Sequence, residues 1–171
     1  KPRALEAIYR SDNPGETDPS KVEWKMVYSG TSKQANDILN DQGPFVGSII
    51  VNPDNTDIIY LGGIAFWKSD DGGKTFIQIS ETENTVELKD LPEEGATYQT
   101  VHDSFGYLHV DIHQIILDKA NDRLFIATDG GIYGAKIEKA RYLDFHYLSG
   151  RLITTQFFQG FANNINNDYD I

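Results

Sequence analysis

The sequence predicts an all-β fold built from repeated four-stranded antiparallel units, and three observations lead to this prediction. Short runs rich in Val, Ile, Phe and Tyr recur between clusters of Gly, Asn, Asp and Pro, which is typical of strands joined by tight turns. The runs fall into two sets of four that resemble each other. Only residues 32–41, "SKQANDILND", favour a helical turn or two, and that stretch is too short and polar to anchor a core.

Each set consists of four strand-sized runs separated by short turns. The first set is "FVGSIIVNP" (45–53), "DIIYLGG" (57–63), "AFWKS" (65–69) and "TFIQIS" (75–80). The second set is "LHVDIHQIILD" (108–118), "RLFIAT" (123–128), "GIYGAKI" (131–137) and "YLDFHYL" (142–148).

The two sets behave as copies, because "NPDNTDIIYLGG" in the first recurs as "DKANDRLFIATDGG" in the second. Four short antiparallel strands per repeat are the plan of a β-propeller blade. We therefore expect part of a β-propeller with the end of a blade in 1–30, complete blades in 44–81 and 107–149, an insertion in 82–106, and the start of the next blade in 152–171.

The ends of such a stack predict partners for its outer surfaces. A blade cannot hide both of its faces alone, so two complete blades leave apolar surface on either side. We expect the remaining blades, or another chain, to cover these faces. The chain starts without Met and ends on "NNDYDI", which resembles the start of a strand, so we interpret it as a fragment of a larger protein.

Composition narrows the classes of function. The net charge is −11, from 15 basic and 26 acidic residues, and such a surface repels a phosphate backbone, so nucleic acid is not an expected partner. No apolar run is long enough to span a membrane, and "KPRALEAIYR" at the start lacks the apolar stretch of a secretion signal. The absence of cysteine excludes disulfide scaffolds, thiolate zinc sites and cysteine nucleophiles.

The stretch "KSDDGGKTF" (68–76) raises the question of an ion or nucleotide site. A phosphate-binding loop needs a Gly where Lys68 stands, and a helix where "TFIQIS" alternates like a strand. A calcium loop starting at Asp70 would place Gly72 and Lys74 at ligand positions that need oxygen side chains. The stretch is therefore predicted to be a hairpin turn, in which Ser and Asp side chains bond to backbone N–H groups and glycines take positive φ.

The residues of this turn resemble the Asp-box of bacterial neuraminidase (BNR) repeats, which occur in the propellers of sialidases, xyloglucanase-type glycosidases and sortilin-like receptors. The matching residues are Ser69, Asp71, Gly73, Thr75 and Phe76. A looser copy has Ser11 and Gly15 in place, with its aromatic residue, Trp24, six residues late. In those families the box is a structural hairpin on the outer rim of the propeller, away from the ligand funnel.

The resemblance extends to three longer segments, which in order look like the propellers of secreted proteins of Bacteroidetes-type bacteria. They are "NPDNTDIIYLGGIAFWKSDDGGKTF", "HVDIHQIILDKANDRLFIATDGGIY" and "LITTQFF". The resemblance implies an extracellular or cell-surface location.

The segment "HVDIH" is the strongest candidate for a ligand site. Strand alternation would place His109, Asp111 and His113 on one face about 7 Å apart. Two imidazoles and a carboxylate are plausible ligands of zinc or iron; the alternative is that they bond to loops of the adjacent blade. In the resembled propellers this strand lines the central channel, which makes the three residues ligand-facing. Asp129 in "TDGG" (128–131) would be their acidic neighbour.

Two functions remain open at this point. The first is a secreted or cell-surface propeller that binds or scaffolds a protein or glycan, with no cofactor. The alternative is a glycoside hydrolase, which needs two carboxylates flanking the scissile bond; Asp111 would supply one. The xyloglucanase-type pattern has an Asp where this chain has Gly47, and no sialidase arginine motif is visible. No catalytic pair is assembled from the sequence, so we favour the binding module and leave enzymatic activity undecided.

Overall fold

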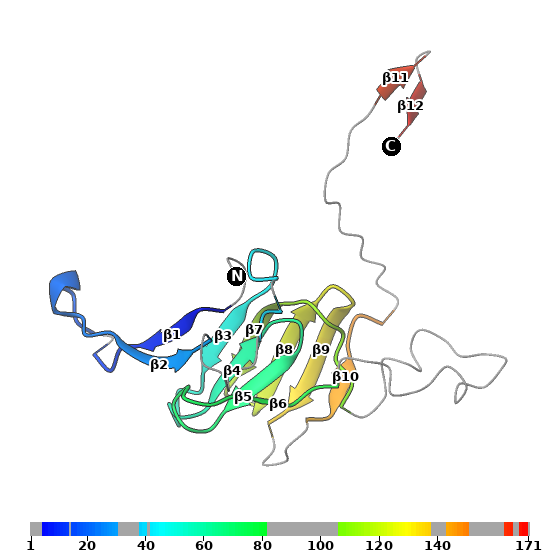
Figure 1. Cartoon of the computed structure of the whole chain (residues 1–171). Coiled ribbons are helices and arrows are strands. Elements are labelled where there is room, and N and C mark those ends of the chain that lie inside the picture. Colours follow the sequence, from blue (N-terminus) through cyan, green and yellow to red (C-terminus); the bar gives the residue numbers. More distant parts are fainter. Residues whose placement is uncertain are drawn as a thin grey trace.

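The protein is described by a computed structural model that covers residues 5–13, 15–30, 38–40, 42–81, 106–137 and 143–150, together with the backbone of two short strands near the C-terminus (Figure 1). The described part contains no α-helix; its one helical element is the 3₁₀ turn η1 (Pro19–Lys21). All of its strands pair in antiparallel sheets of two or four. The prediction of an all-β fold is thus confirmed.

Two four-stranded sheets form the centre of the structure (Figure 1). The first contains β3 (Ser48–Val51), β4 (Ile59–Gly62), β5 (Phe66–Ser69) and β6 (Ile77–Gln78). The second contains β7 (Ile112–Asp118), β8 (Arg123–Thr128), β9 (Gly131–Lys136) and β10 (Phe145–Tyr147). In both sheets each strand pairs with its neighbours in the sequence, which is the antiparallel meander that the two sets of apolar runs predict.

Two further hairpins complete the described elements. The N-terminal one pairs β1 (Ala7–Arg10) with β2 (Lys25–Ser29). Near the C-terminus β11 (Asn163–Ile165) pairs with β12 (Asp168–Asp170). Most of the insertion predicted in 82–106, most of 32–41 and most of 152–171 lie outside the described residues.

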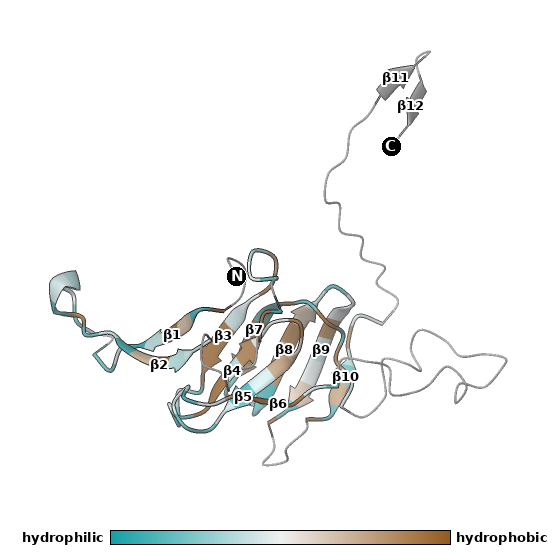
Figure 2. Cartoon of the chain, viewed as in Figure 1, coloured by the Kyte–Doolittle hydropathy of each residue, from teal (hydrophilic) through white to brown (hydrophobic). Residues whose placement is uncertain are grey.

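The two four-stranded sheets share one hydrophobic core. Side chains alternate along β8, where Leu124 and Ile126 are buried and Phe125 between them is partly exposed. On the facing sheet Phe66 stacks on Tyr60 at 5.7 Å and meets Phe145 of β10 edge-on at 5.9 Å. Figure 2 shows the apolar residues concentrated on the strands, with hydrophilic turns between them.

The first strands of the two sheets, β3 and β7, are the nearest strands between the sheets. Ile112 at the start of β7 donates its N–H to the Gly63 carbonyl at 2.9 Å and accepts from the Gly47 N–H at 3.2 Å. A Cβ at Gly62 would overlap the Ile112 side chain, so this close approach of β4 to β7 requires glycine. The first sheet therefore fixes where β7 begins.

A second, smaller core lies on the other face of the first sheet, over β4. Ile59 and Leu61 of β4 are buried there against Tyr28 of the β1–β2 hairpin. Tyr28 also meets Phe76 edge-on at 5.5 Å. The described chain is thus a stack in which the hairpin, the first sheet and the second sheet follow one another in sequence order.

Candidate functional site

The hairpin between β5 and β6 has the turn structure that its sequence predicts. Asp71 Oδ1 accepts hydrogen bonds from the backbone N–H groups of Lys74 and Thr75, both at 2.9 Å, and from the Ser69 hydroxyl at 2.8 Å. Its second oxygen accepts from the Thr75 hydroxyl at 2.7 Å, while the Gly73 N–H donates to Ser69 Oγ at 2.9 Å. Both Asp71 oxygens thus accept hydrogen bonds from within the turn, as expected of a structural hairpin.

The electrostatics of Asp71 agree with this geometry. Its partial burial would raise the pKa of the carboxyl, but the hydrogen bonds from Thr75, Ser69 and Lys74 outweigh burial and lower the pKa from 3.8 to about 2. A carboxylate that accepts several hydrogen bonds is stabilised in its charged form. Asp71 therefore stabilises the hairpin by remaining ionised.

The looser N-terminal copy of the Asp-box, from Ser11 to Trp24, is only partly similar in structure to the Ser69–Phe76 hairpin. The Ser11 hydroxyl donates to Asn13 Oδ1 at 2.5 Å, in the manner of Ser69 and Asp71. Gly15 follows in the same loop, with nothing near the position its Cβ would occupy. Trp24, however, is 64% exposed whereas Phe76 is 7% exposed, so Trp24 does not pack into the core as the aromatic residue of the clean copy does.

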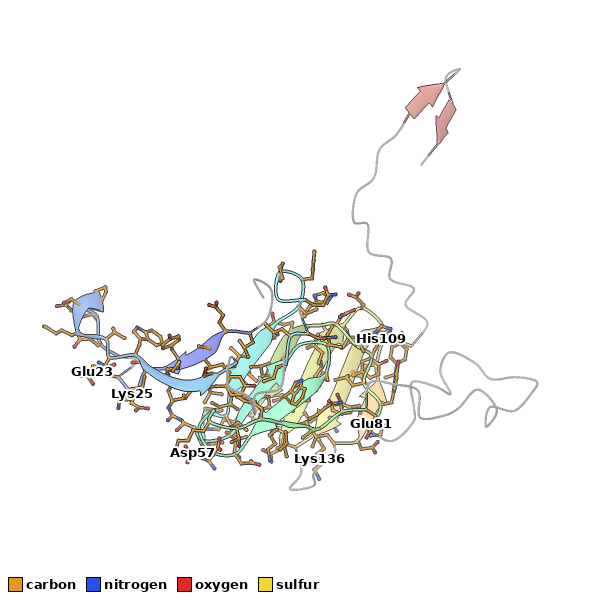
Figure 3. The ribbon with its side chains drawn as sticks, in the orientation of Figure 1. Glu23, Lys25, Asp57, Glu81, His109 and Lys136 are labelled. Carbon is orange, nitrogen blue, oxygen red and sulfur yellow. The ribbon has the colours of Figure 1, made fainter. Side chains whose placement is uncertain are left out.

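A cluster of polar side chains lies where β7 begins and where β8 turns into β9 (Figure 3 labels His109). His113 Nε2 is 2.5 Å from Asp129 Oδ1, and because a carboxylate can only accept, the imidazole N–H is the donor. His109 Nδ1 donates to the Val110 carbonyl at 3.0 Å. The side chains of His113 and Asp129 are 37% and 40% exposed, so the pair faces solvent.

The expected alternation of His109, Asp111 and His113 along one strand is wrong. The strand begins only at Ile112, and Asp111 has a left-handed backbone with φ of +63°. The register then shifts between Ile112 and Gln114, so His113 does not continue a regular alternation. The bonds from Ile112 to the first sheet hold the chain in this turn, and a single strand pattern contains no sign of them.

The four candidate residues nevertheless interact. Burial raises the pKa of Asp111, the nearby Asp129 carboxylate raises it further, and His109 and His113 act in the opposite direction. His109, His113 and Asp129 therefore all lie close enough to Asp111 to act on its carboxyl group. We call these four residues the polar cluster.

The polar cluster does not have the geometry of a metal centre. Within the described residues, no three His, Cys, Asp or Glu side chains are grouped so as to hold a metal ion. One nitrogen of His113 is directed at Asp129 and one nitrogen of His109 at a backbone carbonyl. The zinc or iron ligand set proposed from His109, Asp111 and His113 is thus not assembled here.

The turn between β8 and β9 holds the polar cluster in place through residues that were not predicted as site residues. The Thr128 hydroxyl accepts from the Gly130 N–H and donates to the Gly131 carbonyl, both at 3.1 Å. A Cβ at Gly130 would overlap the His109 ring, so glycine is what allows the imidazole to lie against the turn. The signal in the sequence was "TDGG" itself, in which Thr128 fixes the turn and Gly130 accommodates His109.

The cationic side chains of the described residues lie away from the polar cluster. They occupy the opposite end of the two sheets and the N-terminal hairpin; Figure 3 labels Lys25, Asp57 and Lys136 in that region. Lys119 pairs with Asp54 there, and Arg10 reaches Thr56. The set is Arg10, Lys21, Lys25, Lys68, Lys74, Lys119, Arg123 and Lys136. The carboxylates of the polar cluster therefore have no described Lys or Arg neighbour and can accept hydrogen bonds from a ligand.

An open groove of about 350 Å³ lies between the β1–β2 hairpin and β3. Ile8, Tyr9, Leu39, Ile49 and Leu61 give it mainly apolar walls. The groove contains none of the residues of the polar cluster and differs from it in chemistry.

Comparisons with protein-family models, with curated proteins and with solved structures gave no match. Among the described residues, no helix has the length and apolar character needed to cross a membrane.

Proposed function

We propose that the chain is part of a β-propeller that serves as a secreted or cell-surface binding module for a protein or glycan. The observation that carries the proposal is the arrangement of the two four-stranded meanders. They pack face to face over one core, and their first strands, β3 and β7, are the nearest strands between them. Radially arranged blades converge on their first strands in this way.

Two further features support a stack of blades. The β1–β2 hairpin packs on part of the free face of the first sheet, over β4, as the end of a preceding blade would. The Ser69–Phe76 hairpin has its hydrogen bonds satisfied internally, as expected of an Asp-box that shapes the rim. The secreted or surface location rests on the resemblance of the sequence to BNR-repeat propellers.

The ligand-facing part of this module is the polar cluster. Asp129 is held by His113 and remains partly exposed, and Asp111 lies within its electrostatic influence. Acceptors that lack a described cationic neighbour favour a ligand rich in hydrogen-bond donors. The hydroxyl groups of a glycan and the side chains of a protein both supply such donors.

The test is binding of the purified chain to an oligosaccharide microarray and to an array of peptides. For the ligands retained, Asp129→Asn is expected to weaken binding about fivefold or more, because a charged acceptor becomes a neutral amide. The matched control is Asp57→Asn, an exposed carboxylate at the opposite end of the sheets, which should leave binding unchanged. The proposal fails if nothing is retained, or if both variants bind as the native chain does. Saccharide or peptide spots identify which source of donors is used.

Glycoside hydrolysis is a second candidate, and one observation favours it. A carboxyl whose pKa is raised by burial and by a neighbouring carboxylate, as in Asp111 beside Asp129, is the pattern of an acid paired with a base or nucleophile. Under this candidate the chain releases reducing sugar from xyloglucan or cleaves a fluorogenic sialoside, and Asp111→Asn abolishes the release. Equal rates of sugar release by the native chain and by Asp111→Asn would rule out glycoside hydrolysis at this site.

A further inference from the structure

We propose that the site at the polar cluster takes a neutral saccharide, and that Tyr147 and Ser149 at the end of β10 belong to this site. The inference rests on the proposed function, because it names the ligand class and two further residues of the same binding site. It follows from what the fold brings together at one end of the second sheet, where β7 begins, β8 turns into β9 and β10 ends (Figure 1).

The strand register brings the end of β10 to the turn that carries Asp129. The Leu148 N–H donates to the Ile132 carbonyl and the Ile132 N–H donates to Ser149 Oγ, both at 2.8 Å. Ile132 is the third residue after Asp129 and lies in β9, directly beyond the turn. On the other side of the same turn, Asp129 is held by His113 of β7. Side chains from both edges of the sheet therefore meet at this turn.

Glycine in the turn allows the side chains at the end of β10 to lie against it. A Cβ at Gly131 would be 2.6 Å from Ser149 Oγ and 2.9 Å from Tyr147 Cε2, so any side chain there would displace both groups. Gly130 gives similar room to the His109 ring. With two glycines in succession, the turn itself places no side chain between the carboxylate of the polar cluster that precedes them and the end of β10.

These residues offer a ligand three kinds of contact. The Asp129 carboxylate can only accept hydrogen bonds, and its side chain is 40% exposed. Ser149 Oγ accepts from the Ile132 N–H, so its own hydroxyl proton can be donated to a ligand oxygen. The Tyr147 ring is partly buried against the core and meets Tyr133 edge-on at 5.3 Å, which holds it in place as an aromatic surface. The site thus combines an acceptor, a donor and an aromatic ring.

A saccharide matches this combination. Its neighbouring hydroxyl groups supply donors and acceptors side by side, and the C–H groups of its ring form an apolar face that packs on an aromatic side chain. The charge of the site selects among saccharides, because Asp111 and Asp129 lie close together and repel an acidic sugar. The described Lys and Arg side chains lie at the other end of the sheets or on the N-terminal hairpin. A neutral saccharide is therefore favoured over a sialylated or uronic one.

Amide chemical shifts of the isotope-labelled full chain test the proposal, with cellotetraose and maltotetraose as neutral probes and tetragalacturonate as the acidic probe. We expect at least one neutral probe to shift the amide signals of Gly130 and Gly131. Tetragalacturonate should bind at least about tenfold more weakly, because its carboxylates meet those of the site. Ser149→Ala should weaken binding of the neutral probe about fivefold through the lost hydrogen bond.

Two variants of Tyr147 separate stacking on the ring from packing of the fold. Tyr147→Phe keeps the ring and should bind the neutral probe as the native chain does. Tyr147→Leu keeps apolar bulk without the ring and should bind about fivefold more weakly. The matched control is His146→Ala, since His146 is the neighbouring residue of β10 and its side chain is 69% exposed; it should not change binding. Unshifted amide signals of the buried Leu124 and Ile126 verify that each variant is folded.

Three results would overturn the inference. They are the absence of shifts at Gly130 and Gly131 with both neutral probes, equal affinity for tetragalacturonate, and unchanged affinity in Ser149→Ala or in Tyr147→Leu. If array peptides nevertheless bind the native chain, and bind Asp129→Asn more weakly, the proposed function stands and its ligand is not a saccharide. Absence of both saccharide and peptide binding removes the proposed function as well.

Discussion

Phe66→Ala is expected to lower the free energy of unfolding by about 3–5 kcal/mol, the usual cost of deleting a fully buried phenylalanine. Phe66 has no exposed surface and lies at the centre of the core between the sheets. Its ring contacts Tyr60 within its own sheet and Phe145 on the other sheet. The truncation therefore removes packing both within the first sheet and across the sheet interface.

Urea unfolding followed by tryptophan fluorescence measures this effect. Ile77→Ala on β6 is the control, because Ile77 belongs to the same sheet but is 45% exposed, and its loss should cost less than about 1 kcal/mol. If Phe66→Ala does not fold, Phe66→Leu supplies a smaller change of the same sign. Equal effects of Phe66→Ala and Ile77→Ala would show that the two sheets do not share a core.

Asp71→Ala is expected to destabilise the chain by about 1–2 kcal/mol near neutral pH, while binding at the polar cluster stays unchanged. The estimate allows for solvent screening of a partly exposed carboxylate and rests on the loss of the turn hydrogen bonds. Because the pKa of Asp71 in the folded chain, about 2, lies below its ordinary value of 3.8, its contribution is complete above 3.8. It is lost as the pH falls through about 2.

The measurement is the difference in unfolding free energy between the native chain and Asp71→Ala as a function of pH. Asp70→Ala is the matched control, since Asp70 is the neighbouring residue of the same turn, has a 58% exposed side chain and pairs with Lys68 at 2.8 Å. Its loss should change stability by less than about 0.5 kcal/mol. A difference that does not shrink in acid, or a loss of binding at unchanged stability, would contradict the structural role of Asp71.

The sequence was sufficient to predict the strands and the turns, because these depend on residues that are close together in the chain. The strands of both sheets follow from apolar runs and alternation, and the hairpin from Ser69 to Phe76 follows from residue types that supply its hydrogen bonds and its positive φ. Asp129 and His113, 16 residues apart, were both selected as candidates, and their contact arises because β7 and β8 are adjacent.

The predictions that were wrong depend on contacts between residues far apart in the sequence. The beginning of β7 is displaced from Leu108 to Ile112 because Gly47 and Gly63 bond to Ile112 across the sheets, and no nearby residue signals this. Asp111, just before the strand, has a left-handed backbone conformation. Strand alternation therefore could not predict how His109 and His113 are placed. Trp24 was chosen by residue type, yet the loop before it carries it into solvent.

The two backbone hydrogen bonds that join Ile112 to Gly47 and Gly63 affect how the chain unfolds. Since both backbone groups of Ile112 are bound to the first sheet, β7 cannot separate without breaking contacts of two layers together. The amide proton of Ile112 should therefore exchange with deuterium only through global unfolding, more slowly than those of the exposed turns. Asp111 and His113 flank that amide, so their arrangement persists until the whole stack melts cooperatively.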